Sequence, residues 1–170
     1  MNFFDALRIA LHQPEYLHVL LNPLPVYGLA MGVLAMLAAL ILRNERVVIV
    51  ASALIFFSSL SAWPTYYYGE AAYERAKSMS DAAGGQWLDE HMARGEKWIA
   101  AFYALAVLAL AGIIVPVKWP RASLPLAAIT LAGALVTLCI GGWIAYAGGH
   151  VRHKEFRFEL PPKSTHGHEP

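Results

Sequence analysis

The 170-residue chain has little charge and almost no cysteine. Asp, Glu, Lys and Arg make up 15% of its residues, against about 25% in soluble globular proteins, and 58% are apolar. The net charge of +1 gives no basic excess, so we expect no nucleic-acid partner. The single cysteine, Cys139, excludes an intrachain disulfide. These deficits exclude an ordinary soluble enzyme and a secreted disulfide scaffold, and they favour an integral membrane protein.

Catalytic motifs are missing as well. The chain contains no G-x-S-x-G, no H-E-x-x-H and no glycine-rich phosphate loop. Its long apolar stretches contain no Asp, Glu, Lys or Arg, so a proton or ion pathway lacks its usual relay groups. We therefore expect neither an independent enzyme nor a transporter that works alone.

What the chain does contain is four uncharged stretches long enough to cross a bilayer, which takes about 20 helical residues. They are residues 24–42, 47–69, 98–117 and 122–149. Each must be a helix, because lipid offers no partner to a free backbone N–H or C=O group. The sequence predicts an all-α, polytopic membrane protein whose four transmembrane helices lie within residues 22–150, with the lipid bilayer as its first partner.

The connections between these stretches are unequal. Residues 43–46 and 118–121 are short, so the four helices should form two antiparallel hairpins. Residues 70–97 form a long connection on the side of the two termini, which we call the terminal side. Its helical pattern breaks at Asp81–Gly85, which predicts a small extramembrane cap of two helical extensions and a glycine turn.

The two ends of the chain differ from the spans. In residues 1–21, Phe3, Phe4, Leu7 and Leu11 share one helical face, which predicts an amphipathic segment that lies in the interface and whose helix ends at Pro14. Residues 151–170 predict a polar tail that is partly disordered.

Charge near the spans suggests the orientation. The two short loops hold four basic residues and one acidic residue, and the terminal side holds nine basic and eleven acidic residues. The density of basic residues in short loops places these loops in the cytoplasm of a bacterium, with both termini on the outer side of the inner membrane. The raw count of basic residues favours the opposite orientation.

The two hairpins resemble each other. Trp63, Tyr66, Gly69 and Glu70 recur as Trp143, Tyr146, Gly149 and His150 at the same spacing. This predicts a parallel repeat in which Glu70 and His150 face each other across the bundle axis; two similar aromatic belts are the alternative. Small residues recur every four positions at Gly28 and Gly32 and at Gly133, Thr137, Gly141, Ala145 and Gly149. They predict packing seams within the bundle, with a dimer interface as the alternative.

Histidines gather on the terminal side. All seven lie there: His12, His18, His91, His150, His153, His166 and His168. His18, His91 and His150 are the candidates near the end of the bundle, and imidazole is a common ligand of haem iron and of transition metals. We predict His91, His150 and His18 as ligands of haem b or of a transition metal, with Glu70 and Glu74 as carboxylate ligands or as hydrogen-bond partners of the ligands. The alternative is three interfacial histidines bonded to carboxylates or water.

Two short motifs resemble those of a bacterial family. Asn22-Pro23-x-x-x-Tyr27 opens the first span, and Gly141-Gly142-x-x-x-Tyr146-x-x-x-His150 closes the last. They are similar to the His-Pro-x-x-x-His-Phe-Pro and Gly-Gly-x-x-x-Tyr-x-His-Gly motifs of small four-helix membrane proteins of unknown function. The resemblance implies four helices with a histidine-bearing outer end. Here Asn22 and Tyr27 replace both N-terminal histidines, and His150 is displaced by two residues.

Two functions remain open at this stage. The first is a small integral membrane subunit or accessory protein, redox-linked, that binds haem or metal at its outer end. The second is a structural or assembly subunit without a cofactor, which docks onto other membrane-protein subunits or forms a homo-oligomer through its small-residue stripes.

Overall fold

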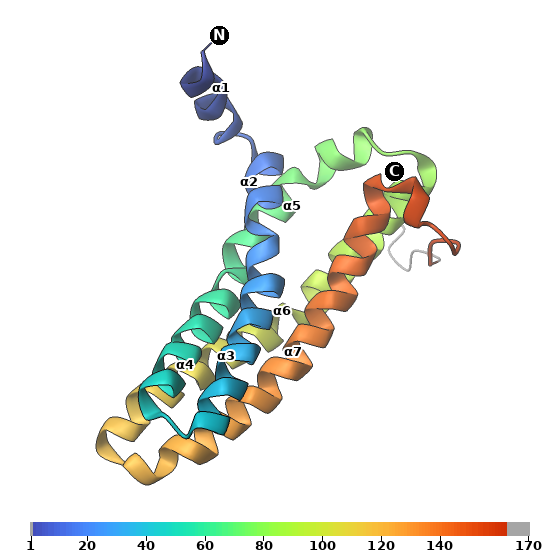
Figure 1. Ribbon diagram of the computed structural model, residues 1–170. Helices are drawn as coiled ribbons and strands as arrows, with labels where there is room; N and C mark the ends of the chain where they lie inside the picture. The colour runs from blue at the N-terminus through green and yellow to red at the C-terminus, as the bar shows by residue number, and fades with distance from the viewer. Residues whose placement is uncertain (1, 163–170) are drawn as a thin grey trace.

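The computed structural model describes residues 2–162, and this part of the chain is helical almost throughout, with no strand (Figure 1). His166, His168 and the end of the predicted polar tail lie outside the described residues. In chain order the helices are α1 (Phe3–Ala10), α2 (Pro14–Leu21), the π-helical turn η1 (Leu24–Gly28), α3 (Leu29–Leu42), α4 (Glu45–Leu60), α5 (Ala62–Ser78), α6 (Ala82–Lys118), η2 (Pro120–Ala122), α7 (Ser123–Arg152) and η3 (Lys154–Phe156).

These helices join into four long rods, each long and apolar enough to cross a membrane. The rods are Pro14–Leu42, Glu45–Ser78, Ala82–Lys118 and Pro120–Arg152. Each contains one predicted span, and three of them extend beyond it on the terminal side by at least eight residues. The prediction of an all-α, multi-pass membrane protein with four transmembrane helices is confirmed.

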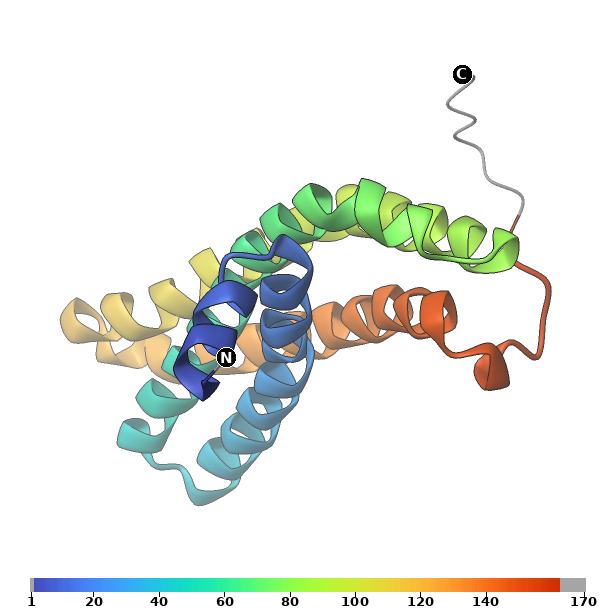
Figure 2. The same cartoon turned by 90° about the horizontal axis from the view of Figure 1, so that it is seen from above.

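The two short connections produce the predicted hairpins. Arg43 has φ 48°, in the left-handed region, and Asn44 caps α4 by accepting the N–H groups of Arg46 and Val47 at 3.0 and 3.3 Å. Trp119 makes the equivalent break between α6 and η2. α3 packs on α4 and α6 packs on α7, and the hairpins meet through α4 with α6 and α3 with α7. Figure 2 shows the bundle from above.

The cap consists of the ends of α5 and α6, but its turn is not where the glycines predicted it. The chain reverses at Met79–Asp81, and Gly84 and Gly85 are already helical. The Asp81 carboxylate caps α6 by accepting the Gly84 N–H at 2.7 Å. A Cβ on Gly84 would lie 2.6 Å from the carbonyl oxygen of Val151, so this glycine allows α6 and α7 to approach closely.

The predicted interfacial segment 1–21 is divided at Pro14. α1 projects from the bundle with Phe3 and Phe4 exposed, and Asn2 caps it (Figure 1). Pro14 begins α2, which continues through η1 into α3 as one rod. Proline at the first helical position has no intrahelical bond to lose, and so it starts the new helix.

Burial repeats between the hairpins in a constant register. The buried residues of α3 (Leu29, Gly32, Val33, Met36 and Ala39) correspond to those of α6 (Phe102, Leu105, Ala106, Ala109 and Gly112). In the partner rods Val48, Ala51, Ile55, Ser58, Ala62 and Ala72 correspond to Ala127, Thr130, Ala134, Thr137, Gly141 and Val151. In this register Gly69 corresponds to Gly148, one residue from the predicted match with Gly149. Glu70 is exposed and His150 is buried, so these two do not form the predicted facing pair.

The small-residue stripes pack within the bundle, as expected. A Cβ on Gly32 would lie 2.7 Å from Ile55, and one on Gly141 would lie 3.2 Å from Phe102. Gly133 faces Leu105 in the same way, whereas Gly149 faces open space. Most of these glycines therefore bring neighbouring helices together.

Candidate functional site

Two of the predicted ligands come together at the terminal end of the bundle. The rings of His18 on α2 and His91 on α6 lie with their centres 6.2 Å apart and their planes at 77°. The two histidines correspond to each other in the register that relates α3 to α6. The pair therefore lies between the two hairpins, with one imidazole from each.

Both rings are held by the same kind of hydrogen bond. His18 Nδ1–H donates to the carbonyl oxygen of Thr65 on α5, and His91 Nδ1–H donates to that of Ile144 on α7, each at 2.9 Å. A carbonyl oxygen only accepts, so Nδ1 must carry the proton in both rings. Neither Nε2 has a hydrogen-bond partner within the described residues, and a histidine that donates through Nδ1 can bind a metal through Nε2.

A glycine lies under each ring. A Cβ on Gly69 would come within 2.8 Å of His18 Nδ1, and one on Gly148 within 3.0 Å of His91 Nδ1. Each glycine follows the accepting carbonyl by one helical turn, so carbonyl and glycine lie on the same helical face. The sequence comparison did not predict this pattern. It aligned the aromatic residues of the two hairpins, and that alignment matches Gly69 with Gly149 instead of Gly148.

The histidine pair lines a cavity of about 70 Å³ that is partly open to its surroundings. All four rods contribute to it, and small residues leave the space: Ala62, Gly69, Gly95, Gly141 and Ala145. Asn22 and Tyr66 are further polar residues of the wall. The π-helical turn η1 borders it with Pro25 and Val26, and such turns occur often at functional sites. Asn22 and Tyr66 were not predicted as site residues.

The third predicted histidine lies elsewhere. The His150 side chain is 3% exposed and is enclosed by Trp87 and Tyr146, whose ring centres lie 4.4 and 4.3 Å from its own. Its Nδ1–H donates to the Tyr146 carbonyl of the same helix at 2.7 Å. Its Nε2 and the Trp87 Nε1 are buried without partners within residues 2–162. We call His150, Trp87 and Tyr146 the cap cluster; His150 does not line the pocket.

The predicted carboxylate ligands are not assembled with the histidines. Glu70 and Glu74 are exposed on α5, and neither lines the pocket. Among the described residues, no three His, Cys, Asp or Glu side chains come close enough to hold a metal ion. The predicted set of His91, His150, Glu70 and Glu74 is thus not brought to one place.

A buried arginine fixes α6 to α7 beside the pocket. Arg94 is 8% exposed; its Nε donates to Glu90 at 2.7 Å and its Nη1 to the carbonyl of Trp143 at 2.8 Å. Its guanidinium also lies over the Trp143 ring, 4.1 Å from the centre. Consecutive carbonyls of α7 thus accept from Arg94 and His91, which holds the two helices in register at the pocket.

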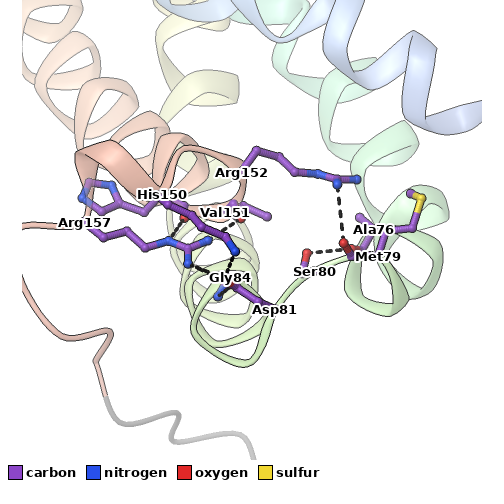
Figure 3. Close-up of polar contacts among 10 residues, drawn as sticks. Ala76, Met79, Ser80, Asp81, Gly84, His150, Val151, Arg152 and Arg157 are labelled. Carbon is purple, nitrogen blue, oxygen red and sulfur yellow. Dashed lines mark hydrogen bonds and ion pairs between the residues drawn. The ribbon is translucent and has the colours of Figure 1, made fainter.

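The first part of the tail closes the cap from outside (Figure 3). Arg157 donates to both carboxylate oxygens of Asp81 at 2.9 Å and to the carbonyls of His150 and Val151 at 2.7 and 2.8 Å. These bonds satisfy the C-terminal end of α7 and join it to the N-terminal cap of α6. The hydrogen bonds from Arg157, then from the Gly84 N–H and Lys154, hold the pKa of the Asp81 carboxyl well below its usual range.

Comparison with known protein families, curated proteins and solved structures finds no match to this chain. The resemblance to the bacterial four-helix family therefore stays a prediction.

Proposed function

We propose that this protein is a small redox-linked subunit or accessory protein of the bacterial inner membrane that holds haem b between His18 and His91. The observation that carries the proposal is the paired imidazoles, each with its Nδ1–H bonded to a carbonyl and its Nε2 without a hydrogen-bond partner among the described residues. A hydrogen bond at Nδ1 fixes the tautomer and ring orientation of a histidine that binds a metal through Nε2.

The separation of the rings supports this. Two imidazoles on opposite sides of one metal ion need about 2 Å from each nitrogen to the metal and about 1 Å from nitrogen to ring centre, or roughly 6 Å between centres. The observed distance is 6.2 Å. The separation of the two ring centres therefore agrees with this requirement.

The ligand count favours haem over a bare metal ion. Two histidines alone do not complete a tetrahedral site, and no third His, Cys, Asp or Glu joins them among the described residues. Haem would bring further ligands of its own, so two histidines from the protein would be enough to hold it. The cavity itself measures about 70 Å³, so the rods would have to part along the small residues of its wall to admit a haem.

The paired histidines also suggest the kind of chemistry. Haem held by both histidines would supply electron transfer. His18 and His91 would hold the iron, and the apolar wall would exclude water. Electron transfer would not require a proton from any other residue of the pocket.

The direct test is the visible spectrum of the full chain, purified in mild detergent through a tag that contains no histidine, from cells supplied with a haem precursor. We expect a Soret band and a reduced spectrum that carbon monoxide does not change. His18→Ala and His91→Ala should each lower haem content and allow carbon monoxide to bind. His12→Ala, His153→Ala and His150→Ala are controls that should keep the wild-type spectrum.

A wild-type protein that is colourless and takes up no added haemin would contradict the proposal. In that case stable co-purification with other membrane proteins would favour the structural subunit without a cofactor. Haem that remains bound in the His18→Ala/His91→Ala double variant would place the site elsewhere.

The proposed orientation has its own support and test. The short loops carry Arg43, Arg46, Lys118 and Arg121 directly at the ends of the rods, which favours a cytoplasmic position. Alkaline phosphatase fused to the C-terminal end should be active outside the cell membrane, and a green fluorescent protein fused there should be dark. The reverse result would place the histidine pair at the cytoplasmic face.

A further inference from the structure

Because the two hairpins share one register, each pocket residue of the first hairpin can be compared with its counterpart in the second. Asn22 in the first rod corresponds to Gly95 in the third, and Tyr66 in the second rod corresponds to Ala145 in the fourth. All four residues line the pocket. The first hairpin therefore supplies the larger, polar side chain at both positions, and the second hairpin supplies the smaller one.

This difference places a tyrosine ring at one seam between the hairpins and no ring at the corresponding position of the other seam. Where α5 meets α6, the Tyr66 ring lies against Gly95, 3.9 and 4.0 Å from where a Cβ would be. Where α2 faces α7, the corresponding residues are Ala145 and Asn22, and neither carries a ring. The arrangement is asymmetric although the backbone plan is repeated.

The packing of the helices shows the same difference between the two seams. α5 packs on α6, whereas α2 makes its contacts with α5 and has no comparable contact with α7 in the described part of the chain. In Figure 1, α2 and the end of α7 are apart on the terminal side. Further into the bundle the same seam is closed, since Val26 lies 3.3 Å from where a Cβ of Gly141 would be.

We infer that the pocket has a lateral entrance between α2 and α7, bordered by Asn22 and Ala145, through which an amphipathic ligand dissolved in the membrane reaches the histidine pair. The entrance lies where the uncharged stretches of the first and fourth rods end, at the level of the lipid interface. A flat apolar molecule with a polar edge fits this path, because its apolar body enters a mostly apolar pocket and its edge remains beside Asn22. With haem as that ligand, the inference rests on the proposed function.

The opening itself can be tested without haem. In a Cys139→Ala background, Asn22→Cys and Gly95→Cys are a matched pair, because they occupy corresponding positions of the repeat. In liposomes, a membrane-dissolved alkyl maleimide should label Asn22→Cys about tenfold faster than Gly95→Cys, since access limits the reaction. Adding Tyr66→Ala should raise labelling of Gly95→Cys. Equal rates, or faster labelling of Gly95→Cys, would overturn the entrance whether or not the protein binds haem.

Haemin uptake then tests the route. Haemin supplied in phosphatidylcholine vesicles to apoprotein in nanodiscs should enter wild-type protein and Gly142→Phe at equal rates, because Gly142 faces open space on α7. Ala145→Phe should slow uptake by about tenfold, because it obstructs the path, and Ala145→Val should lie between. Uptake by Ala145→Phe at the wild-type rate would overturn the route. Wild-type protein that takes up no haemin would instead refute the proposed function, and the maleimide rates would still decide the entrance.

Discussion

The histidine pair and the cap cluster lie at the same end of the bundle and use the same hydrogen bond in different ways. His18 and His91 each bond to a carbonyl of another helix, over a glycine, and face a pocket. His150 bonds to its own helix, four residues back, and is packed between Trp87 and Tyr146. His18 and His91 are thus held between helices at a pocket, whereas His150 fills space in a small core.

The largest effect is expected when the central side chain of the cap cluster is removed, which tests whether the cap cluster and the histidine pair are independent. Trp87 is 1% exposed and packs with Leu88, Ala147 and Val151. Trp87→Ala should lower the free energy of unfolding by about 3–5 kcal/mol because it leaves a large cavity. Thermal unfolding followed by circular dichroism in detergent measures this. Protein that remains folded should keep the haem absorption spectrum that we propose for the histidine pair. Loss of that spectrum in folded protein would show that the two regions are coupled.

The reverse experiment disturbs the pair and spares the cap cluster. Gly69→Ala and Gly148→Ala place a methyl group within about 3 Å of an imidazole nitrogen, and each should cost about 1–3 kcal/mol through overpacking. Each should also displace its histidine and reduce the haem bound. Gly142→Ala is the matched control, because it adds the same group to α7 where nothing is near.

Nitrogen-15 NMR of labelled histidine gives this prediction a readout without haem. In the wild type, both His18 and His91 should show a protonated Nδ1. Gly69→Ala should shift that signal for His18 only, and Gly148→Ala should shift it for His91 only. Unchanged signals in both variants would contradict the positioning role of the glycines.

A smaller effect is expected at the tail, which contacts the cap cluster and not the pocket. Arg157→Ala removes the bonds to Asp81 and to the carbonyls of His150 and Val151. The end of α7 should fray, and trypsin should cut at Lys154 faster than in the wild type. Arg152→Ala is the control, since its bond to the Met79 carbonyl is long, at 3.5 Å. Equal cleavage in both variants would show that Arg157 does not hold the tail.

The weakest effect expected is the dependence of the tail on pH. The hydrogen bond from Arg157 lowers the pKa of the Asp81 carboxyl, so the folded protein binds this proton less readily than the unfolded chain. The stabilisation should be complete above the ordinary Asp pKa of about 3.9 and should be lost as the pH falls through the lower value of the folded state. Trypsin is inactive there, so pepsin should report the release of the tail. Asp81→Asn should remove this step, and its persistence would assign the step to another carboxyl group.

Sequence reasoning reached much of the fold and part of the site. The four spans, the hairpins and the helical cap follow from runs without charge and from short loops, which are local properties. His18, His91 and His150 were all predicted as ligands, but their spacing along the chain could not indicate which two would meet. Asn22 and Tyr66 were missed because a single amide and one of several belt tyrosines have no local signal.

The sequence by itself determined that this chain consists of four helices in lipid, because runs without charged side chains must satisfy their backbone hydrogen bonds internally. It also determined that the histidines gather at one end, since both termini and the connection between the second and third spans lie on the same side of the membrane. Only the tertiary structure decided that His18 meets His91 while His150 does not join them. That outcome depends on the rotation and register of each helix about its axis, which glycines at the contacts fix by allowing close approach.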